Sequence, residues 1–259
     1  MDKLRISAIR YANTFPLNYG LRQSGIEEFA SIEIDHPAEC ARKLKEGEAD
    51  IGLVPVAEIA NIRNATIISD YCIGTKSPVR TVLLVSNTPL EQIDTIYLDY
   101  RSRSSVALAR VLALKHWKKW FNWENTSDKF SFSDIPGGSG LVIIGDQCFD
   151  LEDKYKYRTD LSSEWKSLTA LPFVFACWVA NRKLDDAFIL RFNKALKFGI
   201  ENIDRAIVKY REFSTMPAEV LKEYLTVNID YSLDDEKKLA MKTFIGYIEE
   251  VKRSDGVLG

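Results

Sequence analysis

The residues that could do chemistry gather in short polar segments at predicted strand ends. Asn13 and Thr14 follow a predicted strand at residues 4–9, and Pro16 suits the first turn of a helix. Such a junction exposes backbone N–H groups, which together with an amide and a hydroxyl would bind an anion. Asn and Thr also cap helices commonly, so the junction agrees with an N-cap as well as with a ligand contact.

A second polar segment follows the predicted strand at residues 95–98. Residues 101–105 read Arg-Ser-Arg-Ser-Ser and precede an amphipathic helix predicted over 106–121. Hydroxyls and N–H groups at a helix start suit a carboxylate or a phosphate, and they also suit simple capping. The three hydroxyls belong to Ser102, Ser104 and Ser105.

Two further segments carry charged or polar groups beside apolar runs. Gly145 and Asp146 end a predicted buried strand, and in open parallel sheets such strand ends face the ligand crevice. Asp146 could also cap the next segment. Arg80 and Thr81 begin a β-prone run at residues 79–86, where an arginine would pair with a substrate carboxylate or form a salt bridge between lobes.

Several classes of function find no support in the composition. The net charge of −2 gives no electrostatic case for nucleic acid or membrane binding. No Walker loop occurs, and the glycines at 137–140 precede a strand, so no nucleotide cofactor is indicated. His36 and Cys40 have ligand spacing but no companions, which argues against a metal site.

The N-terminus and the cysteines predict a cytoplasmic protein. The first residues lack a long apolar segment, and no stretch approaches the roughly 18 apolar residues of a membrane span. The four cysteines have no paired spacing, so we expect free buried thiols.

The order of predicted elements indicates two lobes. Strands and helices alternate over the first 62 residues, which predicts a parallel sheet with helices on its faces. Two long β-prone runs, near 79–86 and 172–180, separate an inner α/β segment from an outer one. We therefore expect residues 1–82 plus 183–259 as lobe one, residues 83–182 as lobe two, and a ligand cleft between the lobes.

Several segments together resemble the chorismate dehydratase family of the futalosine route to menaquinone. The resemblance spans about residues 4–182. It rests on residues 11–17 (Tyr-Ala-Asn-Thr-Phe-Pro-Leu), 47–55, 70–73, 78–82, 102–105, 144–146, 160–161, 164–165 and 171–178. The chain departs from the family pattern in three places. Val56-Ala57 stands where the family often has a serine-containing pair after the strand. Ser104 stands where Thr is usual, and Asp99 stands where Thr is common.

The resemblance implies a fold, a reaction and roles for residues. The fold is like that of type II periplasmic binding proteins, with a mixed, mostly parallel sheet flanked by helices in each lobe. The reaction is a cofactor-free loss of water from chorismate that yields 3-[(1-carboxyvinyl)oxy]benzoate. Asn13 would lie beside the reacting carbons. The residues expected to bind substrate are Thr14, Arg80, Thr81, Ser102, Ser104, Ser105, Gly145 and Asp146.

Two other functions remain open on the sequence. One is an enzyme like 1,4-dihydroxy-6-naphthoate synthase of the same pathway, although the second lobe shows no loop histidine to serve as its base. The other is a non-catalytic cytoplasmic protein that binds or senses a solute. No oligomeric state and no identity for the proton acceptor follow from the sequence.

Overall fold

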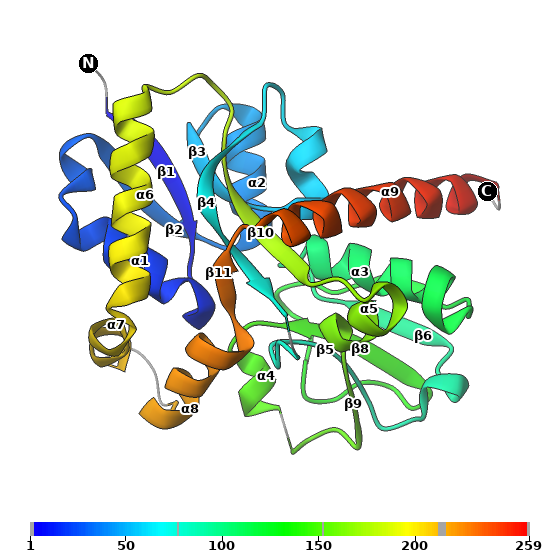
Figure 1. The fold of residues 1–259 in the computed structure, drawn as a ribbon. Coiled ribbons are helices and arrows are strands. Elements are labelled where there is room, and N and C mark those ends of the chain that lie inside the picture. Colours follow the sequence, from blue (N-terminus) through cyan, green and yellow to red (C-terminus); the bar gives the residue numbers. More distant parts are fainter. Residues whose placement is uncertain (1–2, 77, 152, 212–215, 258–259) are drawn as a thin grey trace. The chain divides into compact units, whose positions relative to one another are not determined.

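The chain folds into two compact units. The computed structural model describes residues 3–76, 78–151, 153–211 and 216–257 (Figure 1). The first unit comprises Met1–Gly74 and Val174–Asp234, and the second comprises Thr75–Phe173 and Asp235–Gly259.

The first unit is built on a six-stranded sheet with the strand order β11-β4-β10-β3-β1-β2. Its strands are β1 (Leu4–Ile9), β2 (Ala30–Asp35), β3 (Ile51–Pro55), β4 (Thr66–Thr75), β10 (Phe173–Ala180) and β11 (Asp230–Ser232). Strand β1 runs parallel to β2 and β3, whereas β10 is antiparallel to β3 and β11 is antiparallel to β4. The sheet is therefore mixed, as expected, but these pairs are divided equally between parallel and antiparallel and are not mostly parallel.

Local sequence signals mark the ends of α2, one of the five helices described in the first unit. These helices are α1 (Phe15–Gln23), α2 (Pro37–Glu46), α6 (Asp186–Glu201), α7 (Ile203–Tyr210) and α8 (Ala218–Glu223). Pro37 opens α2, and Gly47 closes it with a φ of 74°, a left-handed conformation that glycine adopts without strain. All five residues of β3 are buried, as the continuous apolar run of a central strand requires.

Two glycines let α1 and α6 approach each other closely (Figure 1). A Cβ atom on Gly199 would lie 1.8 Å from the carbonyl oxygen of Pro16, and one on Gly20 would lie 2.0 Å from that of Ala195. Real side chains do not tolerate such distances, so both positions require glycine. This contact fixes the start of α1, directly after Asn13 and Thr14.

The second unit contains a five-stranded sheet with the order β7-β6-β8-β5-β9. Its strands are β5 (Val82–Ser86), β6 (Thr95–Leu98), β7 (Asn122–Asn125), β8 (Ser139–Ile144) and β9 (Tyr157–Asp160). Its helices are α3 (Ser104–Leu112), α4 (Gln147–Asp150), α5 (Leu161–Thr169) and α9 (Asp235–Val257). Two neighbouring pairs are parallel and two are antiparallel, so this sheet is evenly mixed rather than mostly parallel.

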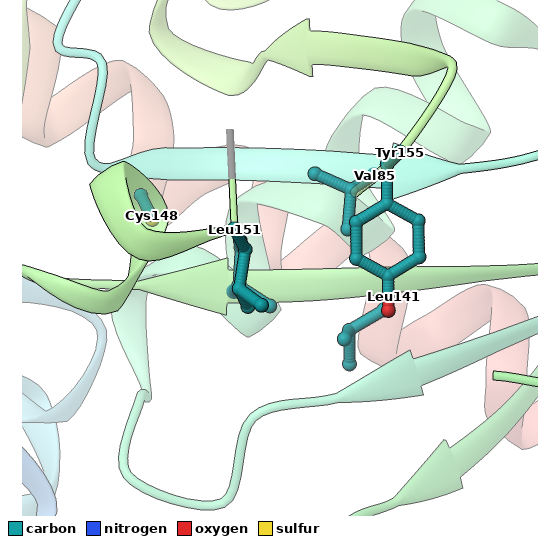
Figure 2. Close-up of a cluster of buried hydrophobic side chains, with 6 residues drawn as sticks. Val85, Leu141, Cys148, Leu151 and Tyr155 are labelled. Carbon is teal, nitrogen blue, oxygen red and sulfur yellow. The ribbon is translucent and has the colours of Figure 1, made fainter. Parts of the chain in front are cut away.

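Two apolar layers hold the second unit together. In one, side chains of β5 and β8 pack with Cys148 and Leu151 of the α4 region and with Tyr155 (Figure 2). The Tyr155 hydroxyl donates a hydrogen bond of 2.7 Å to the carbonyl oxygen of Phe132. In the other layer, Trp165 of α5 is fully buried, and its ring lies edge-on 5.7 Å from that of Phe244 in α9.

The structure corrects the predicted division of the chain. Residues 235–259 group with the second unit and not with the first, because the rings of α9 complete the apolar layer over α5. Along the chain, the boundaries between the units fall after Gly74, Phe173 and Asp234 rather than at 82 and 182. Strand β10 pairs with β3 of the first sheet. The predicted crossing strand at 79–86 becomes β5 only from Val82 onward.

Two local predictions in the second unit also differ from the structure. The helix expected over 106–121 ends as a π-helical turn at Trp117, where Lys118 adopts a left-handed conformation with a φ of 51°. The aromatic residues that follow lie in or beside β7, an edge strand parallel to β6, and not on a helix. Among the described residues, no helix has the length and apolar character that crossing a bilayer requires.

Candidate functional site

Asn13 lies in the turn that joins β1 to α1. It is the middle residue of a single 3-10 turn, Ala12–Thr14. Its amide oxygen Oδ1 is buried and accepts no hydrogen bond from any described residue. A buried polar atom without a partner is costly, and in native proteins it often marks a place for a ligand or water. Asn13 is thus the strongest candidate contact of the first unit.

Thr14 holds the turn rather than capping α1. Its side chain makes no capping hydrogen bond, and the residue is buried. The hydroxyl lies 2.6 Å from the carbonyl oxygen of Ile9 and 2.8 Å from that of Tyr11. Asn18 adds a hydrogen bond of 2.8 Å from its Nδ2 to the same Ile9 oxygen. These bonds join the end of β1 to the first turns of α1.

Tyr231 anchors Asn13 from a distant part of the chain. Its hydroxyl donates a hydrogen bond of 2.9 Å to the backbone carbonyl oxygen of Asn13. Burial raises the pKa of Tyr231 well above its usual value, so the hydroxyl stays protonated and remains a donor. No motif marks Tyr231, which lies 218 residues from Asn13, and sequence reasoning therefore missed it.

The second unit brings three of the predicted segments to one edge of its sheet. Strands β6 and β8 are parallel neighbours, so the serine segment after β6 and Gly145-Asp146 after β8 emerge side by side. The N–H group of Gly145 donates a hydrogen bond of 2.9 Å to the carbonyl oxygen of Thr81, just before β5. Gly145 has a φ of 76°, which allows the chain to turn there.

One of the three serines bonds to the first turn of α3. The Ser102 hydroxyl accepts a hydrogen bond of 3.2 Å from the backbone N–H of Ser105, which satisfies one of the free N–H groups at the helix start. Ser104 and Ser105 belong to the first turn of α3, and all three serines are buried. The three serines therefore lie together at a helix N-terminus, where Ser102 accepts a bond from the first turn.

A buried ion pair holds the loop that carries the serines. Asp99 is fully buried and takes a two-pronged contact from Arg101, whose Nε and Nη2 lie 2.8 and 2.7 Å from its oxygens. Gln147, one residue after Asp146, adds a hydrogen bond of 3.0 Å to the same carboxylate. Asp99, one of the departures from the family pattern, thus links the loop after β6 to the segment after β8.

Arg80 lies beside a small cavity in the second unit. Its backbone φ of 65° is unusual for a residue with a side chain. Its backbone N–H donates a hydrogen bond of 2.8 Å to the carboxylate of Asp160, and the same carboxylate caps α5. The guanidinium lies 5.1 Å from the centre of the Phe149 ring. A cavity of about 180 Å³ is lined by these residues and by Arg158, a second cation that sequence reasoning did not single out.

The cysteines take no part in this chemistry. All four are free and buried, as expected. Burial raises the pKa of the Cys148 thiol, which lines the same cavity, well above its usual value and keeps it protonated. In the part of the chain that the structure describes, no group of three or more histidines, cysteines or carboxylates is placed to hold a metal ion.

The model of a family described as menaquinone biosynthesis matches residues 4–250. This chain belongs to the menaquinone biosynthesis family. The chorismate dehydratase of Thermus thermophilus is 26% identical to this chain, and the match covers 91% of each of the two chains.

Solved structures confirm the predicted fold of this menaquinone biosynthesis protein. A protein of Archaeoglobus fulgidus superposes with a TM-score of 0.73 at 14% identity, covering 98% of both chains. A Candida albicans gene product, described as having the generic periplasmic binding protein fold, gives 0.67 at 16% identity and covers 96% of this chain and 90% of its own. The aliphatic sulphonate binding protein SsuA of Escherichia coli gives 0.61 at 13% identity, with coverages of 97% and 93%.

Proposed function

We propose that this chain dehydrates chorismate to 3-[(1-carboxyvinyl)oxy]benzoate in menaquinone biosynthesis. The observation that carries the proposal is the unpartnered amide oxygen of Asn13, at the strand-to-helix junction through which the chain resembles chorismate dehydratases. Membership of the menaquinone biosynthesis family and the Thermus thermophilus relative named chorismate dehydratase support it.

The reaction balances without an oxidant or a cofactor. A proton leaves the ring carbon that bears the enolpyruvyl ether, and hydroxide leaves the adjacent ring carbon. The electrons of the broken C–H bond form the new ring double bond, and the proton and the hydroxide make one molecule of water. Because the product ring is aromatic, the driving force lies in the substrate, and the protein has to position and polarise it.

Asn13 orients the substrate in this proposal and does not remove the proton. A neutral amide is a poor base, but its oxygen accepts a hydrogen bond well, and Oδ1 of Asn13 has no other partner among the described residues. The enolpyruvyl carboxylate of the substrate itself then takes the proton. Tyr231 and Thr14 act through the backbone of the turn, by holding Asn13 in place.

The second unit supplies the remaining candidate substrate contacts, several of which suit a carboxylate. The buried serines at the start of α3 lie at a helix N-terminus, which favours a negative charge. Arg80 offers a guanidinium, and Thr81, Gly145 and Asp146 join the same edge of the sheet. We propose all of these residues, with Ser102, Ser104 and Ser105, as substrate contacts.

We further propose that the enzyme works in the cytoplasm. Its four cysteines are all free and buried, which suits a reducing compartment. Cell fractionation with an antibody to the chain tests this assignment, and recovery with periplasmic markers would contradict it.

Turnover of chorismate by the purified protein is the direct test of the reaction. We expect an aromatic product, followed by its absorbance and its mass, at 18 mass units below chorismate by loss of water. A thermal shift with chorismate but no product would favour a non-catalytic binding protein. Activity on the cyclic precursor of 1,4-dihydroxy-6-naphthoate, with none on chorismate, would favour the sister enzyme.

Substitution of Asn13 tests its role. We expect Asn13→Ala to lower kcat by about 10²- to 10³-fold, the usual loss when one positioned hydrogen-bonding group is removed. Thermal stability should change little, because the Asn13 amide oxygen makes no hydrogen bond within the described residues. Asn61→Ala, at an exposed asparagine of the same unit, is the matched control and should keep full activity. Full activity of Asn13→Asp with an altered pH profile would overturn the orienting role.

A further inference from the structure

We propose that the first unit holds a second site, which binds a small carboxylate that carries a ring and a hydroxyl group. The site is a cavity of about 390 Å³ beside α1, lined by residues of α1, by Arg10 and Ile34 at the ends of β1 and β2, and by Lys209 of α7. This volume suits a ligand with a single six-membered ring.

The charge of the lining favours an anion. Arg10, Arg22 and Lys209 line the cavity, and none of the described residues that line it is acidic. Neither Arg10 nor Arg22 forms an ion pair with another described residue, whereas Arg5 and Arg101 of the same chain both have carboxylate partners. Guanidinium groups without a carboxylate partner beside a cavity match the two oxygens of a carboxylate.

The walls of the cavity explain why the ligand should carry a ring. Phe15 and Tyr19 of α1 line it together with Ile34 of β2, so apolar surface lies beside the cations. The Tyr19 ring stacks on Phe198 of α6 at 6.4 Å between centres, which holds that wall in one position. Rings with a charged substituent bind well to such surfaces, where apolar contact provides affinity and a few polar groups provide orientation.

Asn18 explains why the ligand should also carry a hydroxyl. The residue lines the cavity but is only 7% exposed. Its Nδ2 donates to the carbonyl oxygen of Ile9 at 2.8 Å and to the hydroxyl of Thr14 at 3.3 Å, which fixes the orientation of the amide. Its Oδ1 accepts no hydrogen bond from any described residue. A hydroxyl that donates to this oxygen would remove the cost of the missing bond.

The test uses 4-hydroxybenzoate as the probe and measures binding by isothermal titration calorimetry, so that it does not depend on turnover. Arg22→Ala should weaken binding about tenfold, because a charge-assisted contact is lost. Arg10→Ala provides a second, independent variant with the same expectation. Arg63→Ala, at an exposed arginine of the first unit outside the cavity lining, is the control and should bind as the natural chain does.

Two further arms identify the ligand chemistry and the site. Benzoate, without the hydroxyl, should bind several-fold more weakly, and phenol, without the carboxylate, should bind more weakly still. Asn13→Ala should bind the probe normally, because Asn13 is not among the cavity residues. Unchanged binding in both Arg22→Ala and Arg10→Ala, or loss of binding in Asn13→Ala, would overturn the proposal.

Discussion

The candidate segments of the two units have the same local structure but are held by hydrogen bonds from different parts of the chain. In each, polar residues follow the end of a parallel strand and lead into a helix, α1 in the first unit and α3 in the second. In the second unit the polar groups find partners nearby, as Asp99 does with Arg101 and Ser102 does with Ser105. In the first unit the Asn13 carbonyl takes its partner from Tyr231, 218 residues away.

This difference separates residues that hold a site from residues that are free to contact a ligand. The polar groups around Asp99 satisfy one another, so their main effect is to fix the loop that carries the serines. Asn13 is held by its backbone, through Tyr231, while the oxygen of its side chain has no partner among the described residues. We infer that the first unit supplies the more specific contact and the second supplies a preformed place for negative charge.

The largest effect on stability is expected at the buried ion pair between Asp99 and Arg101 in the second unit. Arg101→Met leaves the carboxylate of Asp99 buried with only Gln147 and backbone groups as partners, and we expect a loss of about 3–5 kcal/mol in stability. Urea unfolding followed by circular dichroism measures it. Arg42→Met, at a half-exposed arginine of α2 that pairs with Glu39 and Glu48, should have a much smaller effect. Equal losses of stability in both variants would show that the buried pair contributes no more than an exposed one.

A smaller effect is expected where the first unit depends on close helix packing. Gly199→Ala places a methyl group against the Pro16 carbonyl oxygen, so α6 or the start of α1 has to move. We expect a loss of about 1–3 kcal/mol in stability, together with a lower kcat because Asn13 shifts. Gly246→Ala in α9, where nothing lies within 4 Å, should instead gain up to about 1 kcal/mol in thermal or urea unfolding. A gain at Gly199 as well would contradict the packing contact.

Tyr231→Phe tests the distant anchor of Asn13. Removal of one buried hydrogen bond should cost about 1 kcal/mol in stability. If Tyr231 positions Asn13, the variant should also show a several-fold fall in kcat with chorismate. Tyr155→Phe is the matched control, because it also removes a hydroxyl that donates to a backbone carbonyl, in the core of the second unit. The control should lose similar stability and keep its kcat; an equal loss of kcat in both variants would argue against the anchor.

The smallest effect on stability is expected at the pair of Asp50 and Arg5, which lies at the starts of β3 and β1, away from Asn13. Burial by itself would raise the pKa of Asp50, but hydrogen bonds from the Arg5 side chain and backbone, with nearby positive charge, leave it below its usual value. The stability from this pair is therefore complete above the unfolded pKa of about 3.9 and is lost as the pH falls through the lower folded value. Because Arg5 is half exposed, we expect a contribution of at most about 1 kcal/mol.

Asp50→Asn measures that contribution. The difference in unfolding free energy from the natural chain should be present at pH 7 and should fade as the pH falls below the unfolded pKa of about 3.9. The kcat at pH 7 should not change, because Asp50 precedes β3 and meets the start of β1, while Asn13 follows the end of β1. A difference that grows toward acid would mean that the Asp50 pKa is raised in the folded chain.

Much of the first unit followed from local patterns. The predicted place of Pro16 in the first turn of α1 is confirmed. Pro37 and Gly47 likewise stand at the ends of α2, because proline fixes φ at a value that suits a helix start and glycine adopts the left-handed conformation that ends a helix. The continuous apolar run of β3 is typical of a central strand. The second unit followed less well, since β7 is a short edge strand of mostly exposed residues that has no periodic signal.

The sequence by itself determined which chemical groups stand at the ends of which strands. Asn13, Ser102 and Asp146 follow β1, β6 and β8, because short-range propensities decide where strands stop and helices start. Only the tertiary structure decided which of those groups have partners. The Tyr231 hydroxyl reaches the Asn13 backbone, and α9 joins the second unit, through packing between segments far apart in the chain. Hydrogen bonding and burial depend on such neighbours, and no local pattern of residues specifies them.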